Sequence, residues 1–357
     1  MGLFSIFKKK EDQLAAPKGF HTVTIKEKIR LTADSVKLIF DIPAELKAAF
    51  EFTPGQYINL AVKLNKQDIR RSYSICSGTD EELAVGIKKI ENGLFSTYAV
   101  DELNAGDEIW ISGPMGNFKW NKEASTIIAF AAGSGITPIL SIAKAAQKNN
   151  QQMQLYYGNQ SVQSTMFRDE LAVLTAVKQA YYYSREKVEG AFEGRLTKEA
   201  VMDLVKADLP ILRADAFYIC GPQEMVESTK SALTTFGVPE KKIHFELFEA
   251  KVDESKIELP KEGYKGKVAA KVIVDQEEFS FEMDSTTNVL QKALENGADA
   301  PYSCRGGVCS SCKCKIIEGS AEMRINFTLT DSEIQKGYIL SCQAYPTSEK
   351  LIVSFDE

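Results

Sequence analysis

The stretch Ala131-Ala-Gly-Ser-Gly-Ile-Thr-Pro138 decides how the middle of this chain folds. It follows an apolar, strand-like run, Ser125–Ala131, and opens a helical run, Pro138–Lys148. Glycines at such a junction permit a tight turn and a close approach of a pyrophosphate, which the N–H groups of the helix start then bind. A lone G-x-G lacks the third glycine of the full dinucleotide fingerprint, but the strand–loop–helix context favours a nucleotide site. The residues predicted to bind there are Gly133, Gly135, Thr137 and Pro138.

Strand–helix alternation continues on the C-terminal side of this loop. Gln154–Tyr157 precedes a predicted helix at Met166–Val177, and Ala216–Ile219 precedes another at Gln223–Phe236. Strands that alternate with helices are typical of a parallel sheet covered by helices. We therefore predict an α/β nucleotide-binding domain over residues 123–250.

The N-terminal side reads differently. Residues 19–122 consist of short alternating runs, such as Tyr57–Val62, separated by turn signals such as Pro54-Gly55, which predicts an antiparallel β-barrel. Residues 251–266 are charged and read as a linker, and residues 267–357 are long enough for one small α+β domain. Residues 1–18 read as a disordered leader. The predicted fold class is thus multidomain, with a barrel, a parallel α/β domain and a small α+β domain.

The cysteines gather in that last domain. Cys304, Cys309 and Cys312 give C-x₄-C-x₂-C, and Cys342 follows at a distance, which is the plant-type 2Fe–2S spacing. Zinc sites usually pair C-x₂-C with a second such pair or with histidines, and only one tight pair exists here. Cys314 is then the spare cysteine, and we interpret it as a small packed residue.

A second motif, Arg70-Arg-Ser-Tyr-Ser-Ile-Cys76, sits on a predicted barrel strand. Alternation along the strand places Arg71 and Tyr73 on one face. There the arginine can bind the pyrophosphate of a flavin nucleotide, and the aromatic ring can pack on the flavin. The turn Gly93-Leu-Phe-Ser96-Thr97 puts hydroxyls at a helix start, which suits an anion. Each motif alone is weak, but together they predict a flavin site in the barrel.

Bulk composition excludes several classes of protein. The net charge of −6 disfavours nucleic-acid binding, and no run approaches the ~18 apolar residues of a membrane span. Two distant histidines, His21 and His244, leave no His-based metal site and no Ser-His-Asp triad. No signal peptide is recognisable, so we expect a reducing cytoplasm, where clustered cysteines bind metal.

The order of these motifs carries a resemblance. R-x-Y-S with G-x-x-S-T, then AAGSGITP, then Cys220-Gly-Pro222, resembles the ferredoxin–NADP⁺ reductase superfamily. With a plant-type ferredoxin domain of the β-grasp type at the C-terminus, the chain most resembles the reductase subunits of phenylacetyl-CoA oxygenase (ring-epoxidase) systems. The resemblance implies FAD in the barrel, held by Arg71, Tyr73, Ser74, Ile87, Lys88, Gly93, Ser96 and Thr97, with Glu246 and Phe248 closing over the flavin. It also implies that Ser184 and Arg185 hold the 2′-phosphate of NADPH, and that Cys220, Gly221 and Pro222 border the nicotinamide.

These residues predict an electron path from NADPH through FAD to the 2Fe–2S cluster and on to a partner oxygenase. Hydride transfer is expected beside Ser74 and Cys220, which are the predicted catalytic residues. The cluster third of the chain holds 18 acidic against 13 basic residues from 251 to 357, a balance that could steer docking toward a basic partner. Alternatives are another acceptor (a P450, a ring-hydroxylating dioxygenase or a desaturase), an FMN or NADH variant, and a non-enzymatic zinc or carrier protein.

Overall fold

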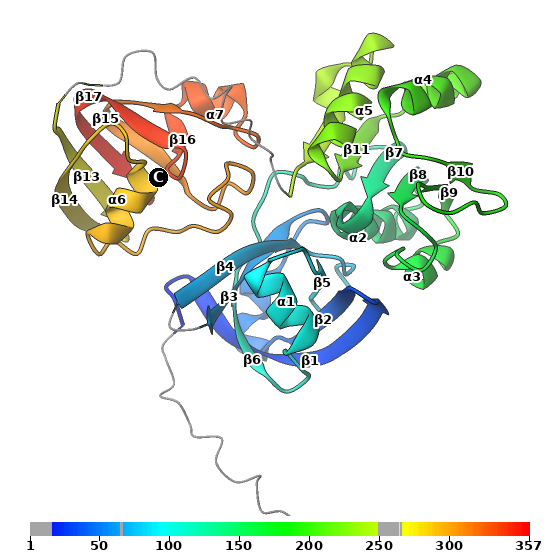
Figure 1. The fold of residues 1–357 in the computed structure, drawn as a ribbon, viewed down its shortest axis with the longest axis horizontal. Coiled ribbons are helices and arrows are strands. Elements are labelled where there is room, and N and C mark those ends of the chain that lie inside the picture. The colour runs from blue at the N-terminus through cyan, green and yellow to red at the C-terminus, as the bar shows by residue number, and fades with distance from the viewer. Residues whose placement is uncertain (1–15, 65–66, 249–263, 265) are drawn as a thin grey trace, which may run out of the picture.

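A computed structural model describes residues 16–64, 67–248, 264 and 266–357 of the chain. It contains three sheets, each in its own domain (Figure 1). The predicted leader lies outside the described residues up to residue 15, and the predicted linker lies outside them except for Tyr264 and Gly266. The antiparallel, parallel and mixed sheets confirm the predicted fold class.

The first domain is the antiparallel barrel (blue to cyan in Figure 1). Its sheet has the order β4-β3-β6-β1-β2-β5. A bridge between Ile75 and Val85 joins the two edge strands, and the Cys76 N–H donates to the Ala84 carbonyl at 2.9 Å, so the sheet closes on itself. The elements are β1 (Phe20–Thr32), β2 (Ser35–Asp41), η1 (Ala44–Phe50), β3 (Tyr57–Leu64), β4 (Gln67–Ser74), β5 (Ala84–Lys88), α1 (Leu94–Asp101) and β6 (Glu108–Ser112).

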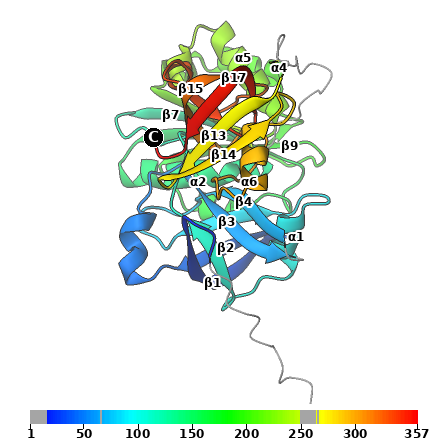
Figure 2. The same cartoon turned by 90° about the vertical axis from the view of Figure 1, so that its left-hand side faces the viewer.

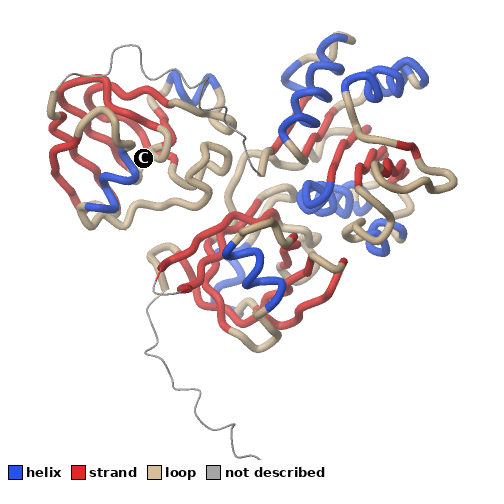
Figure 3. The backbone as a smooth tube through the Cα atoms, viewed as in Figure 1, coloured by secondary structure: helices blue, strands red, loops and turns tan. Residues whose placement is uncertain are grey.

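The second domain is a parallel sheet of order β10-β9-β8-β7-β11-β12 with helices on both faces (Figure 3). Helix α2 packs on the face that also meets barrel residues, whereas α4 and α5 pack on the other face. The elements are β7 (Thr126–Ala132), η2 (Gly133–Gly135), α2 (Ile136–Lys148), β8 (Gln152–Asn159), α3 (Arg168–Ala172), β9 (Val177–Tyr183), β10 (Phe192–Glu193), α4 (Lys198–Ala207), η3 (Leu209–Arg213), β11 (Ala216–Cys220), α5 (Gln223–Thr235), η4 (Glu240–Lys242) and β12 (Ile243–Glu246).

The third domain carries the cysteines on a mixed sheet of order β14-β13-β17-β15-β16. Strands β13 and β17 pair in parallel, and the other neighbours are antiparallel. Figure 2 shows this domain next to the barrel, on the side of β3 and β4. The elements are β13 (Val268–Val274), β14 (Glu277–Met283), α6 (Val289–Glu295), β15 (Lys313–Met323), α7 (Asp331–Gln335), β16 (Tyr338–Leu340) and β17 (Ala344–Ser354).

Close packing fixes the barrel against the parallel sheet. A Cβ atom added at Gly86 of β5 would lie 2.8 Å from the Phe167 ring and 2.7 Å from the Thr137 methyl group, so only glycine lets the two domains approach this far. Across the same junction, the Lys37 ammonium of β2 lies 2.9 Å from the Glu170 carboxylate of α3. Thr137 of the predicted nucleotide loop is therefore held against β5 of the barrel.

Candidate functional site

A cavity of about 780 Å³ lies between the barrel and the parallel sheet. A volume of this size suits a cofactor or substrate of the size of a nucleotide. The predicted site residues that line it are Arg71, Tyr73, Ser74, Lys88, Ser96, Gly133, Gly135, Thr137, Ser184, Gly221, Pro222 and Phe248. Cys304 of the third domain lines the same cavity, so the barrel, the parallel sheet and the cysteine loop meet there.

Strand β4 supplies the barrel wall. The guanidinium of Arg71 donates to the Arg70 carbonyl at 2.7 Å, and the Tyr73 ring packs against Phe95 of α1 with 5.4 Å between centroids. Burial raises the pKa of Tyr73, so its phenol stays neutral beside an anionic ligand. The strand thus presents a cation and a neutral aromatic ring to the cavity.

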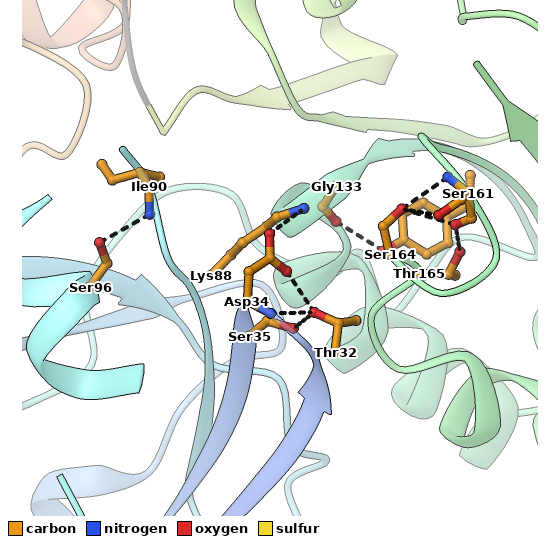
Figure 4. A network of polar contacts seen from close by, with 11 residues as sticks. Thr32, Asp34, Ser35, Lys88, Ile90, Ser96, Gly133, Ser161, Ser164 and Thr165 are labelled. Atoms are coloured by element: carbon orange, nitrogen blue, oxygen red, sulfur yellow. Dashed lines mark hydrogen bonds and ion pairs between the residues drawn. The ribbon is translucent and has the colours of Figure 1, made fainter. Parts of the chain in front are cut away.

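The turn before α1 forms the next part of this wall (Figure 4). The Ser96 hydroxyl accepts from the Ile90 N–H at 3.2 Å and donates to the Gly93 carbonyl at 3.3 Å. A Cβ atom at Gly93 would lie 2.5 Å from that hydroxyl, so the tight turn requires glycine. Thr97 follows in α1 as predicted, one residue beyond Ser96, without lining the cavity.

Strand β5 places two predicted residues differently. The Lys88 ammonium lines the cavity and lies 3.6 Å from the Asp34 carboxylate, as Figure 4 shows. Ile87 is fully buried in the barrel core. Of this pair, only the lysine side chain reaches the cavity.

The loop after β7 lies opposite the barrel wall. A Cβ atom at Gly135 would lie 2.1 Å from the Cys220 carbonyl oxygen, so glycine lets the loop cross the end of β11. Gly133 adopts a positive φ of 54°, and its carbonyl accepts from the Tyr157 hydroxyl at 3.0 Å. Pro138 is buried in the first turn of α2. The predicted nucleotide loop is therefore held in place from two neighbouring strands.

Three predicted residues meet where the domains join. Cys220 ends β11 and pairs in register with Glu246 of β12. The Ser74 hydroxyl of β4 donates to the Glu246 carboxylate at 3.1 Å. Removal from water raises the pKa of Glu246 to about 8, and burial also raises the pKa of the Cys220 thiol well above its ordinary value. At neutral pH the Glu246 carboxyl group and the Cys220 thiol are therefore both protonated, and the protonated carboxyl group lies next to Ser74.

We expect this carboxyl group to make stability depend on pH. The folded-state pKa of Glu246 is raised from 4.5 to about 8, so the folded state binds the proton more tightly than the unfolded state between these values. The free energy of unfolding should therefore fall as pH rises through that window, from about pH 5 to about pH 9. In denaturant melts at a series of pH values, Glu246→Gln should weaken the decrease of the free energy of unfolding with pH. Glu45→Gln, at an exposed position, should leave that decrease unchanged. A Glu246→Gln profile with the wild-type slope would contradict the assignment.

Sequence reasoning missed part of the cavity wall. Arg195 lines the cavity and lies in the loop between the short strand β10 and helix α4. Apart from a glycine next to an arginine, the sequence of this loop contains no motif that would predict a nucleotide contact. Arg185 does not line the cavity, although its N–H donates to the Gln160 carbonyl at 2.9 Å. Further lining residues that were not predicted include Asn159, Gln160, Leu196, Thr197, Met225 and Ser228.

The four cysteines of the spacing motif approach one another in two pairs. The Cys304 N–H donates to the Cys309 sulfur at 3.4 Å, and the Gly306 N–H donates to the Cys304 sulfur at 3.3 Å. A hydrogen bond between the two thiols raises the pKa of Cys304 and lowers the pKa of Cys309. A hydrogen bond to Cys342 likewise raises the pKa of Cys312.

This pairing fits a 2Fe–2S cluster. Within the described residues, no three His, Cys, Asp or Glu side chains converge on one point as a single metal ion would require. A 2Fe–2S cluster with four thiolate ligands needs two sulfurs on each iron, which two separate pairs supply. Arg305, Gly307 and Ser310 adopt positive φ angles of 54°, 75° and 56°, and these turns wrap the backbone around the cysteines.

Comparisons with known proteins agree with this geometry. Three family models match the chain: an oxidoreductase FAD-binding domain at residues 22–120, an oxidoreductase NAD-binding domain at 130–231 and a 2Fe-2S iron-sulfur cluster binding domain at 272–347. No helix among the described residues combines the length and apolar character of a membrane span.

Relatives match over nearly the whole chain. One component of the 1,2-phenylacetyl-CoA epoxidase from Escherichia coli is 34% identical, covering 94% of this chain and 98% of its own length. The ferredoxin reductase component of 3-ketosteroid-9-alpha-monooxygenase from Rhodococcus rhodochrous is 30% identical over 95% and 98%. The structure of phthalate dioxygenase reductase superposes with a TM-score of 0.62 at 25% identity, over 96% of this chain and all of its own. This chain therefore belongs to the ferredoxin–NADP⁺-reductase-like oxidoreductases with a C-terminal 2Fe–2S domain, which carry electrons from NAD(P)H through FAD to the cluster.

Proposed function

We propose that this chain is the NADPH-dependent reductase of a multicomponent oxygenase that acts on phenylacetyl-CoA, in phenylacetate catabolism. The observation that carries the proposal is the 34% identity to the 1,2-phenylacetyl-CoA epoxidase component, over 98% of the length of that component. We also propose a reducing cytoplasm as the location, because clustered cysteines there bind metal. We assign the FAD barrel to residues 19–122, the NAD(P) domain to 123–250, the linker to 251–266 and the cluster domain to 267–357.

The chemistry comes from the bound groups: NADPH supplies a hydride, FAD accepts its two electrons, and the 2Fe–2S cluster carries one electron at a time. The chain orients them. We assign the flavin pyrophosphate to Arg71 and the turn at Gly93 and Ser96, with Thr97 next along α1, and the flavin ring to Tyr73 and Lys88. Ile87, buried in the barrel core, supports this wall from behind. The aromatic side chain of Phe248, 37% exposed at the cavity wall, is assigned to cover the flavin. The cluster ligands are Cys304, Cys309, Cys312 and Cys342.

The catalytic residues proposed are Ser74 and Cys220, with Glu246 orienting the Ser74 hydroxyl. The Ser74 hydroxyl lies between the cavity and the Glu246 carboxyl group, which holds a proton at neutral pH because its pKa is raised to about 8. Cys220 is fully buried and neutral, and it carries the carbonyl that lies against Gly135. Gly221 and Pro222 continue this edge of the nicotinamide site.

The choice of NADPH rests on charge at the nucleotide end of the cavity. Ser184 and Arg195 line it, and Arg185 follows Ser184 at the end of β9. A guanidinium group suits the 2′-phosphate that distinguishes NADPH from NADH. We therefore add Arg195 to the predicted pair Ser184 and Arg185.

Replacing Arg195 with glutamine should raise KM for NADPH by ~10-fold or more, the loss of a charge-assisted contact, and leave KM for NADH nearly unchanged. Steady-state kinetics with both nucleotides measure this. Arg213→Gln, in η3, is the matched loss of an arginine outside the cavity lining and should change neither value. Equal changes for NADPH and NADH would remove Arg195 from the 2′-phosphate site.

A second candidate function keeps the electron path and changes the acceptor. The 3-ketosteroid-9-alpha-monooxygenase reductases are 30–31% identical over nearly their whole length, so a ring-hydroxylating oxygenase is the alternative partner.

Reconstitution separates the two partners. The holoprotein and NADPH are combined with a phenylacetyl-CoA oxygenase component, and in parallel with a 3-ketosteroid 9α-monooxygenase component, and each oxygenated product is measured by mass spectrometry. The proposal predicts efficient product formation with the first. Product with the steroid oxygenase alone would overturn it.

A further inference from the structure

The outward face of the β3–β4 hairpin carries a row of polar side chains. The strands pair in antiparallel register, with Tyr57 opposite Ser74, Asn59 opposite Ser72 and Ala61 opposite Arg70. Because side chains alternate along a strand, these residues share one face, and Tyr73 and Ile58 point to the barrel core. On β4, Tyr73 therefore packs on the barrel core, whereas Arg70, Ser72 and Ser74 share the opposite face, whose end at Ser72 and Ser74 also lines the cavity.

The outward face contacts the cysteine loop of the cluster domain. The Ser72 hydroxyl donates to the Ser303 hydroxyl at 2.9 Å, and the Asn59 side-chain amide donates to the Ser311 hydroxyl at 3.2 Å. The Tyr57 hydroxyl donates to the Cys309 carbonyl and lies 3.1 Å from the Ser311 hydroxyl. These contacts flank three of the four cluster cysteines, so the barrel positions the loop that holds the cluster.

Arg70 is the charged residue of this contact. Its side chain is 6% exposed, and its guanidinium lies 3.3 Å from the Asp299 carboxylate of the cluster domain. The same guanidinium lies 4.6 Å from the Tyr302 ring centroid and 5.3 Å from that of Phe20. Its Nε has no hydrogen-bond partner among the described residues, so the aromatic faces and one carboxylate hold a nearly buried cation. Removing Asp299 therefore leaves the nearly buried Arg70 cation without its carboxylate partner.

We propose that Arg70 is a positioning residue for electron transfer: it holds the cluster domain on the barrel so that the Cys304 loop borders the flavin cavity. Its neighbour Arg71 lines the cavity, whereas Arg70 does not. A hydride brings two electrons and a 2Fe–2S cluster carries one, so the arrangement held by Arg70 serves two successive one-electron transfers for each NADPH. The acceptor protein removes each electron in turn.

A zero-length carbodiimide cross-link reports this docking independently of catalysis. The Lys18 ammonium lies 2.7 Å from the Asp275 carboxylate of the cluster domain, and both side chains are accessible. Lys26 and Glu82, 2.5 Å apart within the barrel, form an internal reference. Peptide mass spectrometry of the holoprotein gives the ratio of the two cross-links.

Flavin-level and cluster-level activities are measured on the same preparations. Reduction of ferricyanide reports electrons leaving the flavin, and reduction of cytochrome c reports electrons leaving the cluster. For Arg70→Gln and Asp299→Asn we expect the Lys18–Asp275 cross-link and cytochrome c reduction to fall by ~10-fold, with ferricyanide reduction unchanged. The double exchange Arg70→Asp with Asp299→Arg should recover part of the Lys18–Asp275 cross-link and part of the cytochrome c reduction. Lys63→Gln, which removes a cation from the same barrel face of β3, should behave as wild type.

Several outcomes would overturn the proposal. Wild-type cross-linking in Arg70→Gln would mean that Arg70 does not hold the domain. A weaker cross-link with undiminished cytochrome c reduction would mean that this docking does not set the transfer. Equal losses of ferricyanide and cytochrome c reduction would place the effect in the flavin site. A double exchange no better than the single variants would show that the charge pair is not the cause.

Discussion

Cys312→Ala is expected to abolish electron delivery through the cluster while the flavin continues to be reduced by NADPH. Cys312 is buried, its thiol pairs with Cys342, and its carbonyl accepts from the Ser341 N–H at 3.0 Å, so its sulfur points to a fixed place. Even an outer partner of a metal ligand contributes 10–100-fold to metal affinity, so loss of a ligand should lower cluster-level activity by more than ~100-fold. Iron analysis measures the cluster content, cytochrome c reduction measures electrons that leave the cluster, and ferricyanide reduction measures electrons that leave the flavin.

Cys314→Ala is the matched control, two residues along the same chain. Cys314 lies in β15, is 1% exposed and belongs to the hydrophobic core of the cluster domain. Alanine there removes one sulfur atom from a packed core, at a cost of about 1 kcal/mol in stability. The variant should keep its iron and its cytochrome c activity. Loss of iron in Cys314→Ala with iron retained in Cys312→Ala would reverse the ligand assignment.

Gly135→Ala is expected to remove most NADPH oxidation. The added Cβ atom would lie 2.1 Å from the Cys220 carbonyl oxygen, 2.5 Å from its carbon and 2.8 Å from the Gly221 nitrogen, all of them backbone atoms. The loop at Gly135 and the end of β11 must therefore move apart, which displaces both walls of the proposed nicotinamide site. Misplacement of about 1 Å can cost ~100-fold in rate, so kcat/KM for NADPH should fall by about that factor.

A second glycine separates this effect from simple backbone strain. Gly237, after α5, has a positive φ of 83°, and a Cβ atom there meets no atom within 4 Å. Gly237→Ala should cost about 1 kcal/mol in stability and leave kcat/KM unchanged. Stopped-flow reduction of the flavin by NADPH compares the variants. Wild-type rates in Gly135→Ala would show that the loop does not form the nicotinamide site.

Local sequence patterns predicted the parts of this protein that local chemistry determines. The C-x₄-C-x₂-C spacing needs no long-range information, because four thiolates on two irons restrict the loop. The G-x-G turn between a strand and a helix is similarly local, and the structure places it at η2 as predicted. The alternation of Arg71 and Tyr73 identified one face of β4 for the same reason.

Features that depend on contacts between domains could not be predicted. Arg70 and Arg71 are adjacent and chemically identical. Alternation along β4 places them on different faces, but it does not show that the face of Arg70 meets Asp299 of the cluster domain, far along the chain. The helix predicted over Met166–Val177 is only Arg168–Ala172. It begins after Phe167, which adopts a left-handed φ of 60° where its ring packs against Gly86 of the barrel, and Val177 already belongs to β9. Arg195 reaches the cavity because β10 pairs with β9, a contact that no short-range pattern records.

An anaerobic titration of the holoprotein with NADPH, followed by visible absorbance and low-temperature electron paramagnetic resonance, tests the electron path most directly. If electrons pass from NADPH through FAD to the cluster, the flavin absorbance should bleach and the signal of a reduced 2Fe–2S cluster should appear in the same titration. Bleaching of the flavin with no cluster signal would contradict the path, because the cysteine pairs would then hold something other than the cluster or lie too far from the flavin.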